Sequence, residues 1–295
     1  MQHIDSSIRT RWCEAGDPPA AVIDSGEVIT VDSASFTEGY SFETMHTLEQ
    51  ITPGSPAPLT APIIIRGATP GGAVRVDVLD LEFLREFGCM LLAPGKGAFP
   101  DVTDRRIARA VMVNDYYVAF SDTVKIPTRK MLGKVSVAPQ GERVLCNQPG
   151  RHGGNMDNRD ITIGSSVYLP VSVEGAHLGV GDGHAVQGDG ECGGSAVEVE
   201  MRTTLRATAL ADIDIRTPVV RSGGFMMTMG AGSTLDEAAD QALSEMHRLL
   251  RSQLGMEAKE TAMMMSLVCD VHVSQLVNPL VSAKVRIPEL YLTLP

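Results

Sequence analysis

The sequence lacks long apolar runs, basic blocks and an excess of positive charge. Its longest apolar stretches, such as AMMMSLVC at Ala262 to Cys269, are far too short to cross a bilayer. The N-terminus also lacks the basic-then-apolar order of a secretory signal. The net charge of −11 and the absence of an RNA-binding aromatic motif oppose a nucleic-acid partner. We therefore expect a cytoplasmic protein that binds neither membranes nor nucleic acid.

The cysteines are few, odd in number and widely separated, and no two of them form a CxxC pair. This spacing argues against both a disulfide framework and a structural zinc knuckle. Buried free thiols are the ordinary expectation for scattered cysteines. The residues concerned are Cys13, Cys89, Cys146, Cys192 and Cys269.

Alternation of apolar and polar residues predicts a chain built mostly of β-strands. Residues 18–35 contain two Val/Ile-rich runs around a Ser-Gly turn, which predicts a β-hairpin. Residues 61–83 predict a strand, a Gly/Pro turn and a second strand. The clearest alternation lies in residues 196–207, with Glu198 on the polar side and Val199 on the apolar side. Such short runs suit a sandwich or irregular barrel better than βαβ units.

The C-terminal part adds helices to this pattern. Thr234 to Glu237 is a capping-box sequence, and apolar residues then recur at helical spacing as far as Leu254. Gly255 is a suitable C-cap for this helix. A second helix is expected over residues 257–268, with its methionines filling the core.

Two strands, near residues 271–277 and 284–287, are expected to complete the chain. The fold class predicted from these patterns is mainly β, with sandwich-like or barrel-like β domains and an α+β C-terminal portion. We place the β-rich portion at residues 1–210 and the C-terminal portion, packed on it, at residues 211–295.

The densest group of polar side chains lies among glycines in residues 149–191. This stretch opens with PGRHGGNMD and closes with GAHLGVGDGHAVQGDGE. In an extended Asp-Gly-His, period-two alternation places Asp182 and His184 on the same side. The same alternation relates Asp189 to Glu191. Because glycines let the backbone approach an ion closely, and a histidine with several carboxylates can bind zinc or another divalent ion, we expect a functional site here.

Ordinary interpretations compete with a site at some of these positions. Asp-Gly turns are common at solvated hairpin tips, and acidic loops also hold calcium through oxygen ligands alone. Residues 188–193, GDGECG, match GxGxxG, but their two acidic side chains would repel a pyrophosphate. Nothing in the sequence around Cys192 would activate a thiol nucleophile. His46 has no visible partner and is expected to be a surface or packing histidine.

The polar blocks resemble the central signature of the acetamidase/formamidase family. PGRHGGNMD, IGSSVYLPV, GAHLGVGDGHAVQGDGE and the strand SAVEVEM follow one another in the order found in that family. Weaker likeness extends over most of the chain, including APIIIRGATPGG, LGKVSVAP and SLVCDVHVSQLVNP. The family pattern has acidic residues where Thr69 and Gly72 stand in this sequence.

The resemblance implies a hydrolase that cleaves a short aliphatic amide, such as formamide or acetamide, to a carboxylate and ammonia at a metal site. Zinc is the expected divalent ion, with calcium as the alternative. Glu191 is expected to pass a proton from the metal-activated water to the leaving amine, and Asn155 or Gln187 to hydrogen-bond the oxyanion. The expected metal ligands are His152, Asp157, Asp182, His184 and Asp189.

Two other functions remain open at this point. One is a metal-dependent hydrolase of another small C–N or ester substrate, which the differences at Thr69 and Gly72 favour. The other is a noncatalytic metabolite-binding β protein with structural calcium. In each case a homo-oligomer is expected, since closed symmetric assembly is common among soluble proteins.

Overall fold

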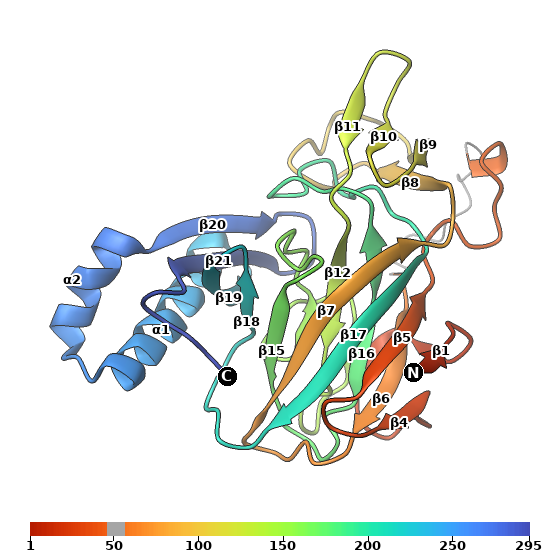
Figure 1. Cartoon of the computed structure of the whole chain (residues 1–295). Coiled ribbons are helices and arrows are strands. Elements are labelled where there is room, and N and C mark those ends of the chain that lie inside the picture. Colours follow the sequence, from red (N-terminus) through yellow and green to blue (C-terminus); the bar gives the residue numbers. More distant parts are fainter. Residues whose placement is uncertain (46–56) are drawn as a thin grey trace.

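Two facing β-sheets enclose the main core in the computed structural model, which describes residues 1–45 and 57–295 (Figure 1). Within these residues a nine-stranded and a six-stranded sheet form the two layers. Smaller sheets of four and two strands accompany them. His46, expected to be a surface or packing residue, lies outside the described residues.

In the described part of the chain, the nine-stranded sheet runs through β1 (Gln2–Ile4), β5 (Val28–Ser33), β17 (Met201–Leu210), β7 (Ala73–Phe83), β15 (Ser166–Pro170), β18 (Val219–Ser222), β19 (Phe225–Gly232), β21 (Val281–Pro288) and β20 (Asp270–Gln275). The six-stranded sheet contains β14 (Gly153–Asn155), β12 (Met131–Ser136), β16 (Leu178–His184), β6 (Leu59–Ile65) and β2 (Arg9–Thr10), with β4 (Ala21–Ile23) paired to β6. The smaller sheets contain β11 (Lys125–Pro127), β10 (Tyr117–Ala119), β9 (Ile107–Val113) and β8 (Phe87–Leu92), and β13 (Val144–Leu145) with β3 (Trp12–Cys13).

The main core forms where apolar side chains of the two layers meet. Val74, Val76 and Val78 of β7 are fully buried, as their alternation with polar residues predicts. They share one core with Leu178 and Val180 of β16 in the other sheet. Burial of each such side chain contributes roughly 1.5–3 kcal/mol. The prediction of a mainly β fold with an α+β C-terminal portion is confirmed.

The helix α1 (Leu235–Leu254) forms where its sequence signals predict it. Thr234 Oγ1 accepts a hydrogen bond from the Glu237 backbone N–H at 3.2 Å. Gly255 ends the helix in the left-handed conformation, with a φ of 64°. Met246 and Leu250 contribute to a second core shared with β19 and β21. The helix therefore covers the end of the nine-stranded sheet (Figure 1).

Helix α2 (Ala258–Val268) follows directly, and its methionines differ from expectation. Met265 is buried, but Met263 is 64% exposed, so the three methionines do not all fill the core. The reason is geometric, because only one face of this short helix packs against the rest of the chain. No helix in residues 1–45 and 57–295 is both long and apolar enough to cross a membrane.

The predicted hairpin at residues 18–35 is wrong. The turn itself forms, with Gly26 at a φ of 85°, but β4 pairs in parallel with β6 and β5 pairs with β17. Each run thus joins a longer strand in a different layer. The turn connects the two sheets instead of closing a hairpin.

The four strands β18 to β21 extend the same nine-stranded sheet as β5, β7 and β17. The chain segment between β17 and β18 contains the predicted boundary at residue 210. The division into residues 1–210 and 211–295 stays a prediction, but the hydrogen-bonded sheet is continuous across it.

A buried lysine joins the C-terminal strands to two loops of the central stretch. Lys284 on β21 is 1% exposed, and its Nζ donates to Asn158 Oδ1 at 2.9 Å, Asp160 Oδ2 at 2.7 Å and Asp189 Oδ1 at 2.9 Å. All three ammonium protons are therefore used. Burial alone would raise the pKa of Asp160, but Lys284 and Arg129 hold it below its usual value.

Replacing Lys284 by Met should lower the free energy of unfolding by about 2 kcal/mol, because partly exposed Asp160 and Asp189 lose the buried ammonium that they share. Removing the exposed Arg66, which pairs with Asp24 at 2.8 Å, should lower it by less than about 1 kcal/mol. A carboxyl with a lowered pKa in the folded state stabilises the fold above its unfolded pKa and loses this effect as pH falls. The difference in the free energy of unfolding between wild type and K284M should therefore become smaller below about pH 4.

Urea titrations at pH 7 and at pH 3.5 measure both effects. Equal losses for the Lys284 and Arg66 variants, or a difference independent of pH, would contradict the assigned ion-pair network.

Candidate active site

The side chains of the central stretch gather at one end of the six-stranded sheet. β16 supplies Asp182 and His184, and the loop after β14 supplies Asp157. Two further carboxylates come from the segment after β16. The whole cluster is buried, and it consists of Asp157 (1% exposed), Asp182 (4%), His184 (0%), Glu191 (7%) and Glu198 (4%).

Within this cluster, His184 belongs to two groups of possible metal ligands. Ligand atoms of Asp157, His184 and Glu191 lie within 4.8 Å of one another, and so do those of Asp182, His184 and Glu198. These are the groups that emerge from the described residues. The two groups therefore meet at this histidine, which lies at the centre of the cluster.

Gly133 on β12 leaves a space at this centre. A Cβ at this position would lie 2.5 Å from Asp157 Oδ1, 2.6 Å from Asp182 Oδ2 and 3.0 Å from His184 Cε1. Any side chain here would therefore collide with three of the cluster residues. Only glycine leaves the point on which they converge open.

The ring of His184 is oriented by Gln187. Gln187 Nε2 donates to the Asp157 carbonyl oxygen at 2.7 Å, which leaves its Oε1 to accept from His184 Nδ1 at 2.9 Å. Nδ1 therefore carries a proton, and Nε2 is the ring atom that faces the carboxylates. Nε2 lies 3.2 Å from Glu198 Oε2 and 3.6 Å from Asp182 Oδ2, and has no hydrogen-bond partner among the described residues. A metal-ligating imidazole is held in the same way, through its other nitrogen.

Two asparagines continue the hydrogen bonding outward from Asp157. Asn278 Nδ2 donates to Asp157 Oδ2 at 2.7 Å, and Asn278 Oδ1 accepts from Asn155 Nδ2 at 3.0 Å. Asn278 Nδ2 also donates to the Asn155 backbone carbonyl oxygen at 3.4 Å, and a carbonyl oxygen only accepts, so the amide of Asn278 has one orientation. That orientation in turn fixes the amide of Asn155. Asp157 Oδ1 is left without a hydrogen-bond partner in the described part of the chain.

Three of the site carboxylates lie on unusual backbone. Asp157, Asp182 and Glu191 have φ angles of 44°, 62° and 48°, in the left-handed region that residues other than glycine seldom adopt. Among the described residues, the other non-glycine positions with positive φ are Ala176 and His177. Backbone strain of this kind persists where the surroundings impose it, which is often at functional sites.

Lys134 pairs with one of the carboxylates. Its Nζ lies 3.2 Å from Asp182 Oδ1 and donates to the Ala57 carbonyl oxygen at 3.0 Å. Burial alone would raise the pKa of Asp182, but Lys134 and His184 hold it below its usual value. Burial would likewise lower the pKa of Lys134, and the nearby Asp182 raises it above its usual value.

The other carboxylates of the cluster, Asp157, Glu191 and Glu198, have raised pKa values, because burial and neighbouring negative charge disfavour their ionised forms. Burial, followed by the charge of Asp182, raises the pKa of Asp157 to about 7. Burial and then Asp157 raise the pKa of Glu191 well above its usual range, and burial also raises the pKa of Glu198. Burial would lower the pKa of His184, but Glu198 and Asp182 raise it well above its usual value. A bound cation would stabilise these groups in their ionised forms.

A cavity of about 180 Å³ opens onto the cluster. The polar part of its wall includes Glu191 and Glu198 together with Asn155 and Asn278. Its apolar lining consists of Phe36, Ala57, Leu91, Ala93 and Val277, and further polar groups come from Lys96, Arg106, Lys134, Asn147, Asp182 and Ser195. A small molecule in this cavity would therefore meet both the carboxylates and the two asparagines.

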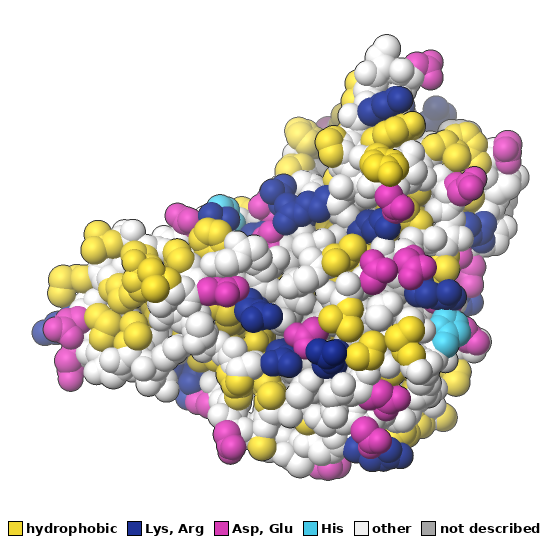
Figure 2. Space-filling view, in the orientation of Figure 1, with side chains coloured by type: hydrophobic (Ala, Val, Ile, Leu, Met, Phe, Trp, Pro, Cys, Tyr) yellow, Lys and Arg dark blue, Asp and Glu magenta, His cyan; other side chains and the backbone are white. Residues whose placement is uncertain are grey.

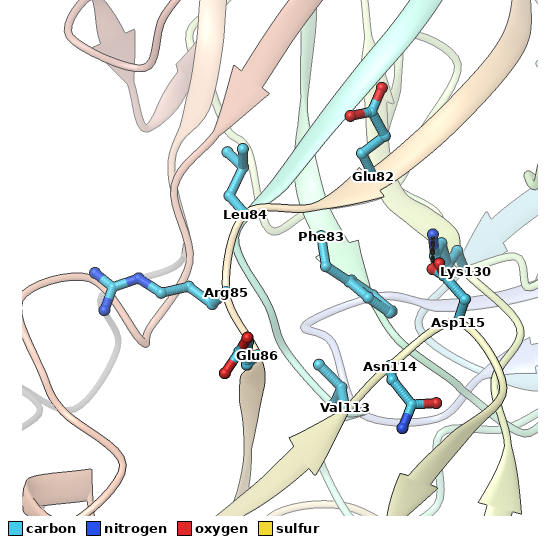
Figure 3. A pocket seen from close by; sticks show the side chains of 9 residues that line it. All are labelled: Glu82, Phe83, Leu84, Arg85, Glu86, Val113, Asn114, Asp115 and Lys130. Carbon is cyan, nitrogen blue, oxygen red and sulfur yellow. Dashed lines mark ion pairs between the residues drawn. The ribbon is translucent and has the colours of Figure 1, made fainter.

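A second cleft, of about 440 Å³, shares no lining residue with this cavity (Figure 3). Its lysine, Lys130, donates to the Leu81 carbonyl oxygen at 2.8 Å, pairs with Asp115 at 2.5 Å and lies over the Phe83 ring. The second cation of this cleft, Arg85, pairs with Glu200 at 3.2 Å, so both cations are already paired within the chain. None of the sequence-predicted site residues lines it.

The structure brings three of the five predicted metal ligands together and places the other two elsewhere. Asp157, Asp182 and His184 meet at the Gly133 space, whereas Asp189 pairs with Lys284 and lies 3.7 Å from Arg159 Nε. His152 is buried with Nε2 unpartnered among the described residues, and burial lowers its pKa to about 4. Neither Asp189 nor His152 belongs to a group of possible metal ligands in the described residues.

The expectation that Asp189 and Glu191 point to the same side is wrong. The Glu191 backbone N–H donates to the Gly188 carbonyl oxygen at 3.1 Å, and Gly190 and Glu191 both have positive φ. The segment is therefore a turn, and period-two alternation does not apply to it.

Four residues of the site were missed from the sequence. Glu198 was placed on the polar face of a strand, but residues 196–200 precede β17 and Glu198 is buried against His184. Gly133 and Lys134 interrupt a buried strand, and a lysine inside such an apolar run was the available signal. Asn278 lies in a loop that carries no pattern pointing to Asp157.

The sequence differences at Thr69 and Gly72 fall in the turn between β6 and β7, far from the cluster. The Ile65 backbone N–H, at the end of β6, donates to the Gly175 carbonyl oxygen just before β16 begins. His184 lies at the opposite end of β16. A seven-residue strand separates the two ends by about 20 Å. A Cβ at Gly72 would lie 2.6 Å from the Leu210 carbonyl oxygen, so an acidic side chain does not fit there in this protein.

Comparison with known proteins agrees with this geometry. Residues 121–292, more than half of the chain, match the Acetamidase/Formamidase family. A formamidase of Methylophilus methylotrophus is 22% identical over an alignment of 316 positions. This alignment covers 82% of this chain and 76% of that protein. An acetamidase structure from Bacillus halodurans has a TM-score of 0.93 and 30% identity, covering 98% of both chains.

A further solved structure, a predicted acetamidase/formamidase from Thermoanaerobacter tengcongensis, has a TM-score of 0.94 and 28% identity. The alignment covers 98% of this chain and 96% of that one. The likeness thus extends through both sheets and both helices as well as through the polar blocks. The chain belongs to the acetamidase/formamidase family and is a hydrolase of amide C–N bonds.

Proposed function

We propose that the protein hydrolyses a short aliphatic amide, of the formamide or acetamide kind, to a carboxylate and ammonia with the help of a divalent ion. The observation that carries the proposal is the convergence of Asp157, Asp182 and His184 on the open space at Gly133. The relatives named formamidase and acetamidase support the amide substrate. The cavity of about 180 Å³ suits a substrate with few atoms.

The residues present fit a metal ion. Asp157 Oδ1 and His184 Nε2 are buried atoms without a hydrogen-bond partner among the described residues, and both belong to side chains that border the Gly133 space. We propose Asp157, Asp182 and His184 as ligands, without His152 and Asp189. An imidazole nitrogen beside carboxylates favours zinc, since calcium takes oxygen ligands. When bound, the ion would polarise the amide carbonyl and lower the pKa of a water molecule.

Glu191 is proposed to handle the proton. It lines the cavity, and its Oε2 has no hydrogen-bond partner in the described part of the chain. In hydrolysis, a water oxygen bonds to the carbonyl carbon, and Glu191 takes the proton that the water loses. Glu191 then gives this proton to the nitrogen as the C–N bond breaks, so that ammonia leaves and a carboxylic acid remains, which loses its proton to water on release and becomes the carboxylate.

Gln187 is proposed to position His184 instead of binding the oxyanion. Both ends of its side-chain amide already have partners, at 2.7 Å and 2.9 Å. A role at the oxyanion would require one of these bonds to be given up. Holding the imidazole in one orientation is the function that its contacts support.

Replacing Gly133 by Ala should abolish metal binding, because the new methyl group would occupy the space where the proposed ligands converge. Elemental analysis of the purified protein should give about one divalent ion per chain for wild type and almost none for G133A. Gly188 has open space where a Cβ would be, so G188A is the matched control and should keep its metal. Full amidase activity of metal-free wild-type protein would rule out the role of the ion.

Replacing Glu191 by Gln should lower kcat on acetamide by at least about 100-fold, because the amide cannot accept the proton from water. KM and metal content should change little, since the side-chain shape is kept. Exposed Glu174 provides the control E174Q, for which steady-state kinetics should match wild type. If E191Q loses its metal, Glu191 is a ligand and another group transfers the proton.

We further propose a cytoplasmic homo-oligomer. All five cysteines are free thiols in the structure, as suits a reducing compartment. Met263 (64% exposed) and Leu267 (85% exposed) lie one turn apart on α2, where Figure 2 shows apolar side chains gathered. Exposed apolar surface of this kind is typical of protein interfaces.

Leu267→Glu should lower the molar mass in solution to that of a single chain, because a charge would have to be buried in the interface. Light scattering after size-exclusion chromatography measures this, with exposed Leu290→Glu as the control. A wild-type mass equal to one chain, or a mass unchanged by L267E, would contradict an interface at α2.

A further inference from the structure

We propose that Asn155 Oδ1 accepts a hydrogen bond from the –NH2 group of the substrate, which makes the site selective for primary amides over esters of the same size. This inference rests on the amide hydrolysis proposed above. In this proposal Asn155 accepts a hydrogen bond from the substrate, whereas a residue that binds the oxyanion must donate one. The acceptor end of the Asn155 amide is the end that has no partner among the described residues.

The orientation of Asn155 follows from the chain of bonds that begins at Asp157. Asp157 Oδ2 accepts from Asn278 Nδ2 at 2.7 Å, so the other end of that amide, Oδ1, is an acceptor. It accepts from Asn155 Nδ2 at 3.0 Å. Turning the Asn155 amide over would place two oxygens against each other. The carboxylate of Asp157 therefore fixes Asn155 through Asn278.

The oxygen of Asn155 is left without a partner in a place where a substrate can supply one. Asn155 is 7% exposed, and its Oδ1 is buried with no hydrogen-bond partner among residues 1–45 and 57–295. A buried acceptor without a donor is destabilising. Asn155 lines the same cavity as Glu191 and Glu198, so a donor on a molecule in that cavity would satisfy it.

The unpaired atom of Asn155 is an oxygen, and this decides which substrates are favoured. An oxygen that only accepts cannot stabilise an oxyanion, whereas it matches the N–H groups of a primary amide and of the departing ammonia. An ester presents an oxygen at the same position and would leave Asn155 Oδ1 unpaired. Sites built to bond an N–H or O–H group discriminate strongly against analogues without it.

The test compares kcat/KM for acetamide with kcat/KM for methyl acetate in the metal-loaded protein. In Asn155→Leu the ratio of the two should fall by at least about tenfold relative to wild type, because only the amide loses a bond. Damage to the fold or to metal binding would lower both rates and leave the ratio unchanged. Asn155→Ala removes the same acceptor without adding bulk to the cavity, so its ratio should fall to a similar extent.

Asn147 provides the matched control. It lines the same cavity and also has a buried Oδ1 without a partner in the described residues, but it is not part of the Asp157–Asn278–Asn155 chain. Asn147→Leu should leave the ratio unchanged.

An unchanged ratio in Asn155→Leu, or a fall in Asn147→Leu instead, would overturn the proposal. If Asn155→Leu hydrolyses neither substrate, an unchanged ratio in Asn155→Ala would overturn it, and a tenfold lower ratio would support it. Wild-type protein that hydrolyses neither acetamide nor any related amide would instead contradict the proposed function itself.

Discussion

The repulsion among four buried carboxylates around one histidine is the constraint on which the rest of this structure depends. Asp157, Asp182, Glu191 and Glu198 are all at least nine-tenths buried, and Lys134 is the one lysine whose ammonium reaches them in the described part of the chain. Burying a carboxylate without a partner costs several kcal/mol, so such a cluster cannot be an accident of packing. Either protons or a cation must occupy it.

The backbone around the cluster is built to keep these groups in place despite their repulsion. Three of the four acids have left-handed φ angles, so the chain accepts local strain in order to aim them inward. Each loop that carries them is also tied down from outside. Asn278 holds Asp157, and Lys284 holds Asn158 and Asp189, which lie next to the strained positions. Rigidity at this site thus comes from hydrogen bonds supplied by β21 and by the loop before it.

Local patterns in the sequence predict the parts of the fold that depend on local chemistry. The α1 helix, with its cap at Thr234 and its end at Gly255, follows from propensity and capping, and the alternation in β7 follows from burial on one face. The pairing of β4 and β5 with other strands could not be predicted in this way. A tight turn shows that the chain reverses direction, but the partners are chosen by contacts far away in sequence.

The site shows the same division. Asp182 and His184 could be placed together because a single intervening residue separates them within one strand. Glu198 and Asn278 could not be placed, because each reaches the cluster only through the tertiary fold. Asp189 was misplaced for a related reason, since the turn at Gly190 cancels the alternation that a strand would have imposed. Short-range geometry was predictable, and the identity of the remaining partners was not.

The bonds made by Asn278 and Lys284 also set an order of events during synthesis. The two residues follow the loops that they hold by 121 and 95 positions, measured from Asp157 and Asp189. A ribosome releases both acidic loops well before it releases the strand that steadies them. The nascent chain therefore passes through a period in which the acids are present but free to spread apart and remain solvated. The proposed ion binding and amide cleavage should then arise together, at the moment when β21 docks against the completed sheet.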